Sequence, residues 1–289
     1  MADRDQVNVN WFPGHMTKAL RAMEGDLKLV DAVIELTDAR IPRSSRNPAL
    51  DEVLGQKPRL VLLNRADLAD PAATERWLRY YRASGVAALA ADSRGGKGVE
   101  KLPAAMRALL KEKLERLAAK GQASRPIRAM VVGIPNVGKS TFINKAAGRK
   151  AAAAGNKPGV TKGRQWITVD RSLELLDTPG VLWPRFEDPA VGEHLAFTGA
   201  VKEEILDQEA LALRLAELLN REYRELFRAR YKLGDTEGLD GPALLEAAAR
   251  KRGFLVSGGE TDLERMSRVL LVEFQAGSLG RITLEEPEC

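Results

Sequence analysis

The sequence predicts an α/β domain with a parallel-rich sheet and helices on both faces, followed by a small all-α domain at the carboxyl end. Short apolar runs alternate with amphipathic helical segments, polar residues follow several of these runs directly, and only helical patterns continue beyond about residue 200. A chain of 289 residues is long enough for two cores. We expect one domain over residues 1–195 and a second over 196–289.

The expected elements of the first domain alternate along the chain. Helices are predicted where apolar residues recur every three to four positions, and strands where short apolar runs end at polar or glycine residues. In chain order the prediction is helix 17–29, strands 32–36 and 59–63, helix 72–83, strand 86–90, helix 100–120, strand 127–132, helix 141–145 and strand 173–176. Gly121 and Pro126 lie in the segment that ends the long helix.

Four helices are expected in the second domain, at about residues 203–219, 221–231, 242–252 and 261–276. Pro242 is typical of a helix start, and residues 261–264, Thr-Asp-Leu-Glu, have the pattern of a capping box with Thr261 as the cap.

Composition is that of a soluble globular protein. Hydrophobic residues make up 44% and charged residues 29%, and no apolar run approaches the roughly 20 residues that span a bilayer. The first ten residues are polar, unlike a signal peptide. Cys289 is the only cysteine, which excludes a disulfide framework and a cysteine zinc site. We expect a cytoplasmic monomer with no membrane partner.

Positive charge is concentrated in the first domain. Residues 1–200 carry 32 Lys and Arg against 22 Asp and Glu, whereas residues 201–289 carry 13 against 18. No acidic residue occurs over 116–169, where eleven basic residues lie. A long positive stretch favours a polyphosphate or a nucleic-acid backbone as ligand, although a solvated basic surface has the same pattern.

Residues 133–140, Gly-Ile-Pro-Asn-Val-Gly-Lys-Ser, have the pattern of a phosphate-binding loop, with a predicted strand before and a predicted helix after. In such a loop the backbone N–H groups bind the α- and β-phosphates, Lys139 reaches the β- and γ-phosphate oxygens, and the Ser140 hydroxyl binds Mg²⁺. The expected nucleotide-binding residues here are Asn136, Val137, Gly138, Lys139, Ser140 and Thr141, and Lys139 is also expected to be catalytic.

Residues 64–67, Asn-Arg-Ala-Asp, follow an apolar strand and have the pattern of a guanine-binding loop. The Asp67 carboxylate can accept from both N1–H and the exocyclic amine of guanine, which predicts GTP rather than ATP. Asn64 is expected to join this loop to the phosphate loop, and Asp92 and Ser93 to bring backbone to the guanine oxygen. Arg65 replaces the usual lysine, and its planar head can lie over the base. Alone, the tetrapeptide is more typical of a turn.

Mg²⁺ and the γ-phosphate have further candidate ligands. Asp177 follows an apolar strand and can hold Mg²⁺ through water, while the Gly180 N–H can meet the γ-phosphate. Thr161 lies between this motif and the phosphate loop, at the spacing of a switch threonine. The predicted Mg²⁺ ligands are therefore Ser140, Thr161 and Asp177, and Thr161 and Gly180 join the predicted nucleotide-binding residues.

The side chain that usually orients the attacking water is absent from its expected position. Val181 occupies the position after Gly180, where many GTPases have a water-orienting glutamine. His15 lies in an aromatic and Pro/Gly-rich segment and is the candidate catalytic base, whereas His194 lies in a helical stretch and is assigned to packing or surface. A lone histidine is more often structural, and that alternative stays open for His15.

The two nucleotide motifs occur in the reverse of their usual order. Residues 64–67 precede the phosphate loop at 133–140, whereas an ordinary GTPase has the phosphate loop first. The parts are complete but rotated, which predicts a circularly permuted P-loop GTPase domain whose two loose ends flank the γ-phosphate.

With these motifs the chain resembles the circularly permuted GTPases of the ribosome biogenesis GTPase A family. The resemblance covers nearly the whole chain and includes residues 11–16, 38–42, 44–48 and 279–285 besides the nucleotide motifs. It implies GTP hydrolysis, late maturation of the large ribosomal subunit, binding of its rRNA and ribosomal proteins but not DNA, stimulation by that particle, and a helical carboxyl-terminal domain.

Three residue roles follow from the resemblance. His15 matches the family's hydrolytic histidine, Asn136 matches the asparagine associated with K⁺-stimulated GTPases, and Val181 matches a hydrophobic replacement of the glutamine. Arg65 and the acidic balance of the last domain depart from the family pattern. That domain can still contact RNA phosphates through its basic clusters, which are Arg221, Arg224, Arg228, Arg230, Lys232 and residues 250–252. A nucleotide-gated RNA-binding switch with incidental hydrolysis is the main alternative function, and an ATPase is opposed by Asp67.

Overall fold

The computed structural model describes residues 13–148, 165–183, 186, 188–201 and 207–288, with side chains from residue 20 onward. The chain forms two compact units. Of the described residues, 13–183 and 283–288 belong to the sheet unit, and 186–282 belong to the helical unit. The expected domains over residues 1–195 and 196–289 stay a prediction, and residues 283–288 belong with the sheet unit.

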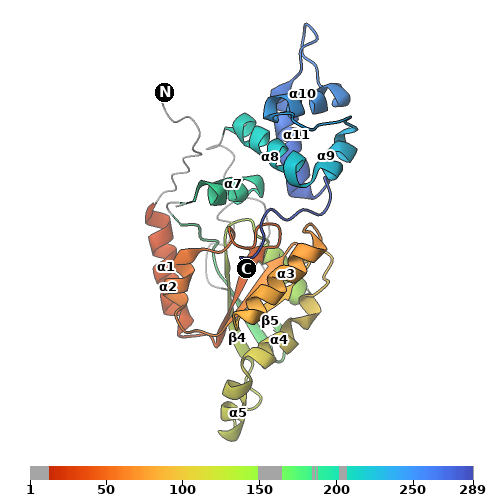
Figure 1. Ribbon diagram of the computed structural model, residues 1–289. Coiled ribbons are helices and arrows are strands. Elements are labelled where there is room, and N and C mark those ends of the chain that lie inside the picture. The colour runs from red at the N-terminus through yellow and green to blue at the C-terminus, as the bar shows by residue number, and fades with distance from the viewer. Residues whose placement is uncertain (1–12, 149–164, 184–185, 187, 202–206, 289) are drawn as a thin grey trace. The chain divides into compact units, whose positions relative to one another are not determined.

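In the described part of the chain, six strands form the sheet in the order β3-β2-β1-β4-β6-β5 (Figure 1). Neighbouring strands are parallel except β5, which is antiparallel to β6 at the edge. Their bounds are β1 Ala32–Asp38, β2 Arg59–Asn64, β3 Ala87–Ala90, β4 Ile127–Gly133, β5 Gln165–Asp170 and β6 Leu173–Asp177. The central strands are buried along nearly their whole length, which explains why they are continuous apolar runs in the sequence.

Helices cover both faces of this sheet, as predicted. Val33 and Met130 are register partners, so their side chains share a face, and they pack with α1 (Pro13–Leu27) and α2 (Pro48–Leu54). On that same face α3 (Pro71–Ala83) packs Trp77 against β2. The helices α4 (Leu102–Leu109) and α6 (Lys139–Ala146) contact β2 and β4 respectively from the opposite face.

The predicted long helix over 100–120 is wrong as a single element. The structure has a short 3-10 turn η1 (Val99–Lys101), then α4, and then a separate helix α5 (Lys111–Ala119). The break falls at Leu110, which is 3% exposed and leaves helical geometry at ψ 17°, although no glycine or proline lies there. Burial of Leu110 in the sheet unit decides this turn, whereas helix propensity favours continuation. In Figure 1 α5 extends beyond the layers of the sheet unit.

The helical unit contains α7 (Pro189–Phe197), α8 (Gln208–Glu222), α9 (Arg224–Tyr231), α10 (Gly241–Arg252) and α11 (Leu263–Ala276). Its core includes Phe197 and Phe274, whose rings meet edge to face. Asp262, not Thr261, caps α11, because its carboxylate accepts from the Arg265 N–H. No helix among the described residues is both long and apolar enough to cross a membrane.

A tail formed by residues 283–288 follows the helical unit and packs on the sheet unit. Its backbone donates from Leu284 N to Arg40 O over 2.8 Å, and the carbonyl of Glu285 accepts from Trp77 Nε1 over 3.0 Å. The Glu285 carboxylate is 5% exposed and accepts from Arg43 N at 2.6 Å and from both the N–H and the hydroxyl of Ser44. The tail thus fastens the loop after β1 in place.

Candidate functional site

The expected site lies where the parallel strands end. β1 and β4 are neighbours, yet the chain proceeds from β1 toward β2 and from β4 toward β6, on opposite sides. In open α/β sheets, ligands bind at the carboxyl ends of the strands where the strand order reverses in this way. The residues found at these ends are Asp38, Asn64, Gly133 and Asp177, which are the last residues of β1, β2, β4 and β6, and Asp92 and Ser93 shortly after β3.

Glycines shape the phosphate loop, because backbone and side chains approach it closely. Gly133 has φ 150°, and a Cβ there would lie 2.5 Å from the Leu36 carbonyl oxygen. Gly138 has φ 98°, and a Cβ there would lie 2.5 Å from Asn64 Nδ2. Gly138 precedes α6, whose first turn has no side-chain cap. The N–H groups of that turn, including those of Ser140 and Thr141, can therefore bind an anion.

Lys139 is held within this loop. Its ammonium donates to the carbonyl oxygens of Gly133 at 3.1 Å and Ile134 at 2.8 Å, and the residue is 8% exposed. Burial lowers the pKa of Lys139 to about 8, although the nearby Asp177 carboxylate favours its charged form. A bound phosphate would place negative charge beside this buried ammonium and so favour its charged form.

Asn64 joins the base loop to the phosphate loop, as predicted. Its Nδ2 donates to the Val137 carbonyl over 2.8 Å, and its Oδ1 accepts from Ser93 Oγ over 2.6 Å. All three groups are buried. One side chain therefore connects the ends of β2, β3 and β4, and residues from both motifs meet although their order in the chain is reversed.

Arg65 has a different contact from the one expected. Its guanidinium donates to the Asn136 carbonyl and lies 3.4 Å from the Asp38 carboxylate, so the head group is occupied between two loops. Arg65 and Asn136 both have positive φ, near 59° and 57°. Burial would raise the pKa of Asp38, but Arg40 and Arg65 outweigh it and hold that pKa below its ordinary value.

Asp67 is exposed beside a second carboxylate. Burial of part of the side chain and the charge of Asp92 raise the pKa of Asp67. The Asp92 carboxylate accepts from Arg94 N and Gly95 N, each at 2.8 Å, and so shapes its own turn. Two donors placed side by side, as on the guanine edge, would favour the charged form of this carboxylate.

The segment after β6 packs directly on the phosphate loop. Thr178 Oγ1 donates to Val131 O over 2.6 Å, and a Cβ on Gly180 would lie 2.8 Å from both Lys139 Nζ and the Pro135 backbone. Val181 is 2% exposed and belongs to the core that contains residues of α1 and α2. A side chain buried in this way is not placed to orient the attacking water. This agrees with the presence of a valine at a position where many GTPases have a glutamine.

The donor set suits Mg²⁺ that is held largely by nucleotide and water. Asp177 is a buried carboxylate close enough to Lys139 to act on its pKa, and Ser140 begins the adjoining helix. No cluster of three or more His, Cys, Asp or Glu that could hold a metal occurs in the part of the chain that the structure describes. Mg²⁺ prefers oxygen ligands, which the Asp177 carboxylate and the Ser140 hydroxyl would supply.

Two predicted residues cannot be placed. Thr161 lies outside the described residues, and of His15 only the backbone is described, in the first turn of α1. His194 is buried in α7, with its ring 6.3 Å from that of Phe197, in agreement with a packing role.

Asn47 is a site residue for which the sequence offered no role. Its Oδ1 accepts from Ala49 N and caps α2, while its Nδ2 donates to the Val181 carbonyl over 3.0 Å. Asn47 therefore joins the loop after β1 to the segment after β6. It occurs within residues 44–48, which carry part of the family resemblance, and that pattern was the only available signal.

Known proteins share this architecture and sequence. A family described as 50S ribosome-binding GTPase matches residues 128–223. A protein of Priestia megaterium named "Ribosome biogenesis GTPase A" is 48% identical over 97% of this chain and 98% of its own length. The GDP-bound structure of TM YlqF has TM-score 0.68 and 28% identity, covering 93% of this chain and all of its own. The GNP-bound YlqF from T. maritima has TM-score 0.64 and 28% identity over 94% and 99%.

The match to the 50S ribosome-binding family begins within β4, immediately before the phosphate loop, as a rotated motif order requires. The near-complete coverage of both chains extends the likeness to the base loop at residues 64–67 and to the tail. With a guanine-type loop joined to a phosphate loop by Asn64, this chain is a GTP-hydrolysing enzyme with a circularly permuted P-loop domain and belongs to the ribosome biogenesis GTPase A family.

Proposed function

We propose that this GTPase acts in late maturation of the large ribosomal subunit, in the cytoplasm, and that the particle stimulates its hydrolysis. The protein binds the subunit and its rRNA with GTP and leaves after hydrolysis. The observation that carries the proposal is the assembled site around Asn64 in a chain whose residues 128–223 match 50S ribosome-binding GTPases. The basic excess of residues 1–200 supports an RNA partner.

Catalysis is proposed to proceed by in-line attack of water on the γ-phosphate. Lys139 and the N–H groups at the start of α6 stabilise negative charge on the phosphates, and the base is selected at Asp67. When bound, Mg²⁺ neutralises phosphate charge, with Ser140, Asp177 and Thr161 as its ligands. Asn136 is the proposed K⁺ ligand, and its loop conformation is fixed by the hydrogen bond from Arg65.

Water activation is proposed to depend on His15. Val181 is buried in the core, so another side chain must orient water, and His15 begins the helix α1 that packs on Val181 through its later turns. We propose that the subunit brings this histidine into position, so that the free enzyme is slow.

The decisive measurement is GTP turnover in K⁺ and in Na⁺ buffer, each with and without purified large subunits. The proposal predicts stimulation by subunits, a higher rate in K⁺, and loss of stimulation in His15→Ala with GTP affinity retained. The buried Val181 also favours a nucleotide-gated RNA-binding switch, for which subunits bind with GTP but leave turnover unchanged. Equal stimulation of His15→Ala and the parent would show that His15 is structural.

A further inference from the structure

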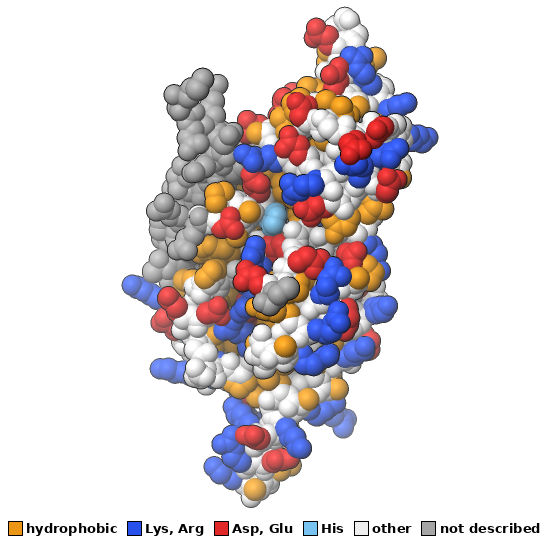
Figure 2. Space-filling view, in the orientation of Figure 1, with side chains coloured by type: hydrophobic (Ala, Val, Ile, Leu, Met, Phe, Trp, Pro, Cys, Tyr) orange, Lys and Arg blue, Asp and Glu red, His pale blue; other side chains and the backbone are white. Residues whose placement is uncertain are grey.

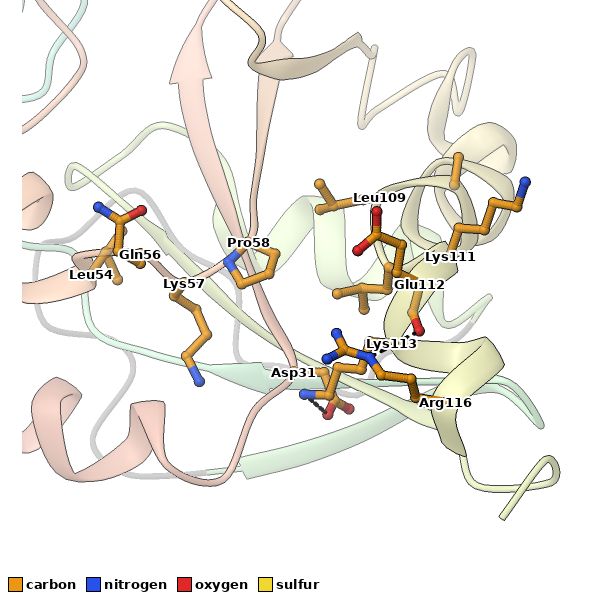
Figure 3. Close-up of a pocket in the computed structure, with 12 residues that line it drawn as sticks. Asp31, Leu54, Gln56, Lys57, Pro58, Leu109, Lys111, Glu112, Lys113 and Arg116 are labelled. Carbon is orange, nitrogen blue, oxygen red and sulfur yellow. Dashed lines mark hydrogen bonds and ion pairs between the residues drawn. The ribbon is translucent and has the colours of Figure 1, made fainter. Parts of the chain in front are cut away.

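A pocket of about 860 Å³ opens in the sheet unit at the amino ends of its strands, away from the nucleotide loops. One wall is the turn of residues 54–58 between α2 and β2, and the other is the junction of α4 and α5 at residues 108–116. Figure 3 shows these two walls facing each other, with Asp31 at the base between them. The volume lies within the range of pockets that bind organic ligands.

Positive charge dominates this pocket. Its basic lining residues are Lys57, Lys111, Lys113 and Arg116, against the acidic Asp31 and Glu112. Asp31 is already paired with Lys113 at 2.7 Å and with Arg125 at 3.3 Å. Among the described residues, no acidic partner lies within ion-pair distance of Lys57, Lys111 or Arg116. Three cations are therefore available to an anion: Lys57 on one wall, Arg116 on the other, and Lys111, whose side chain points outward from the rim (Figure 3).

Lys57 is the inner member of this set. It is half-buried, and its ammonium donates to the Val30 carbonyl over 3.1 Å. Burial and the charge of Lys113 lower the pKa of Lys57. An anion in the pocket would relieve the crowding of the two ammonium groups.

The arginines of the helical unit differ in this respect. Arg230 and Arg252 both pair with Glu273, at 2.5 and 2.7 Å, and Arg250 pairs with Glu246 at 2.6 Å. These basic residues already have acidic partners of their own. In the pocket only Lys113 has such a partner, and Lys57, Lys111 and Arg116 can pair with an added polyanion.

The shape of the pocket favours a chain-like ligand. The pocket is larger than one phosphate requires, and Leu54, Pro58 and Leu109 give it an apolar lining between the cations. Beside it, α5 buries no residue, and Figure 2 shows Lys and Arg side chains on the surface there together with acidic ones. Separated cations over an apolar floor suit the phosphates and the sugar and base faces of an unpaired RNA strand.

We propose that this pocket binds a short single-stranded segment of RNA, with Lys57, Lys111 and Arg116 on its phosphates. The inference rests on the proposed function, because it takes the RNA to belong to the large subunit. The pocket would be an RNA contact region at the amino ends of the strands, opposite the nucleotide site, and it is formed by residues 54–58 and 108–116.

The test compares two full-length variants with equal charge change. The pocket variant carries Lys57→Gln, Lys111→Gln and Arg116→Gln, and the control carries Arg79→Gln, Arg82→Gln and Lys101→Gln, which are exposed on α3 and η1 outside the pocket. Binding of a fluorescein-labelled oligouridylate is measured by anisotropy over a range of salt. Three lost phosphate contacts predict an affinity about ten- to a hundredfold weaker and a salt slope smaller by about 2.

The control variant should lose much less, and basal GTP turnover should be equal in all three proteins. Equal losses in both variants would overturn the proposal, because binding would then follow net charge alone. Displacement of the RNA by polyglutamate at matched charge concentration would also overturn it and assign the pocket to an acidic protein.

Sedimentation with large subunits separates the two levels of inference. If the parent protein does not bind subunits with GTP, the proposed function fails. If the parent and the pocket variant bind equally well and RNA cross-links map outside residues 54–58 and 108–116, the function stands and the pocket proposal fails.

Discussion

The tail offers a sharp test of how this enzyme is held together. Glu285→Ala removes a carboxylate that is 5% exposed and accepts from Arg43 N, Ser44 N and Ser44 Oγ. The hydroxyl can rotate to another acceptor, but two backbone N–H groups are left without theirs. At about 1–2 kcal/mol for each such group, the free energy of unfolding of the sheet unit should fall by about 2–4 kcal/mol.

Glu288→Ala is the matched control, since Glu288 pairs with Arg43 through side chains that are 78% and 51% exposed. Such a surface pair contributes about 0–1 kcal/mol. Urea unfolding followed by tryptophan fluorescence is a suitable assay, because Trp77 donates to the Glu285 carbonyl. With a slope of about 1–3 kcal/mol per molar urea, the midpoint should fall by about 1 M for Glu285→Ala and hardly change for Glu288→Ala. Equal shifts in both variants would refute the assigned role of the buried carboxylate.

Three further outcomes are expected. Because the pKa of Lys139 is lowered to about 8, its ammonium is charged below that pH and neutral above it, so GTP affinity should fall as pH rises through about 8. Lys139→Arg, which stays charged, should lack this fall, and an affinity for the parent that stays constant to about pH 9 would contradict the assignment. Arg65→Gln should weaken GTP binding about tenfold by fluorescence titration, through the lost hydrogen bond to Asn136, whereas the surface change Arg79→Gln should not. Val181→Gln should lower the unfolding free energy by about 1–3 kcal/mol more than Val181→Ala, because it buries an amide. Basal turnover should stay unchanged, since the side chain at this position lies in the core. Faster turnover in a stable variant would show that this position faces the nucleotide.

Local sequence predicted much of the fold and part of the site. Strands β1, β2, β4 and β6 are buried apolar runs, and each was expected within two residues of its observed ends. The phosphate loop was recognisable because its chemistry lies in eight consecutive residues between a strand and a helix. The edge strand β5 was missed, because it has exposed residues along much of its length and no continuous apolar run.

Contacts between distant residues were not predictable in the same way. The contacts of the Arg65 guanidinium with Asn136, 71 positions later, and with Asp38 were not expected from the sequence. The role of Asn47 depends on Val181, 134 positions later in the chain. Neither partner can be recognised from a local sequence pattern, because such a pattern shows only the spacing of apolar residues and which of them are buried.

By itself the sequence determined the nucleotide chemistry and the permuted order, because each motif is a short run whose function depends on neighbouring residues. The tertiary structure decided how the motifs are joined. Asn64 reaches Val137 across 73 positions, and Glu285 reaches Ser44 across 241. The physical reason is that buried polar groups need partners, and only the folded chain decides which distant group becomes the partner.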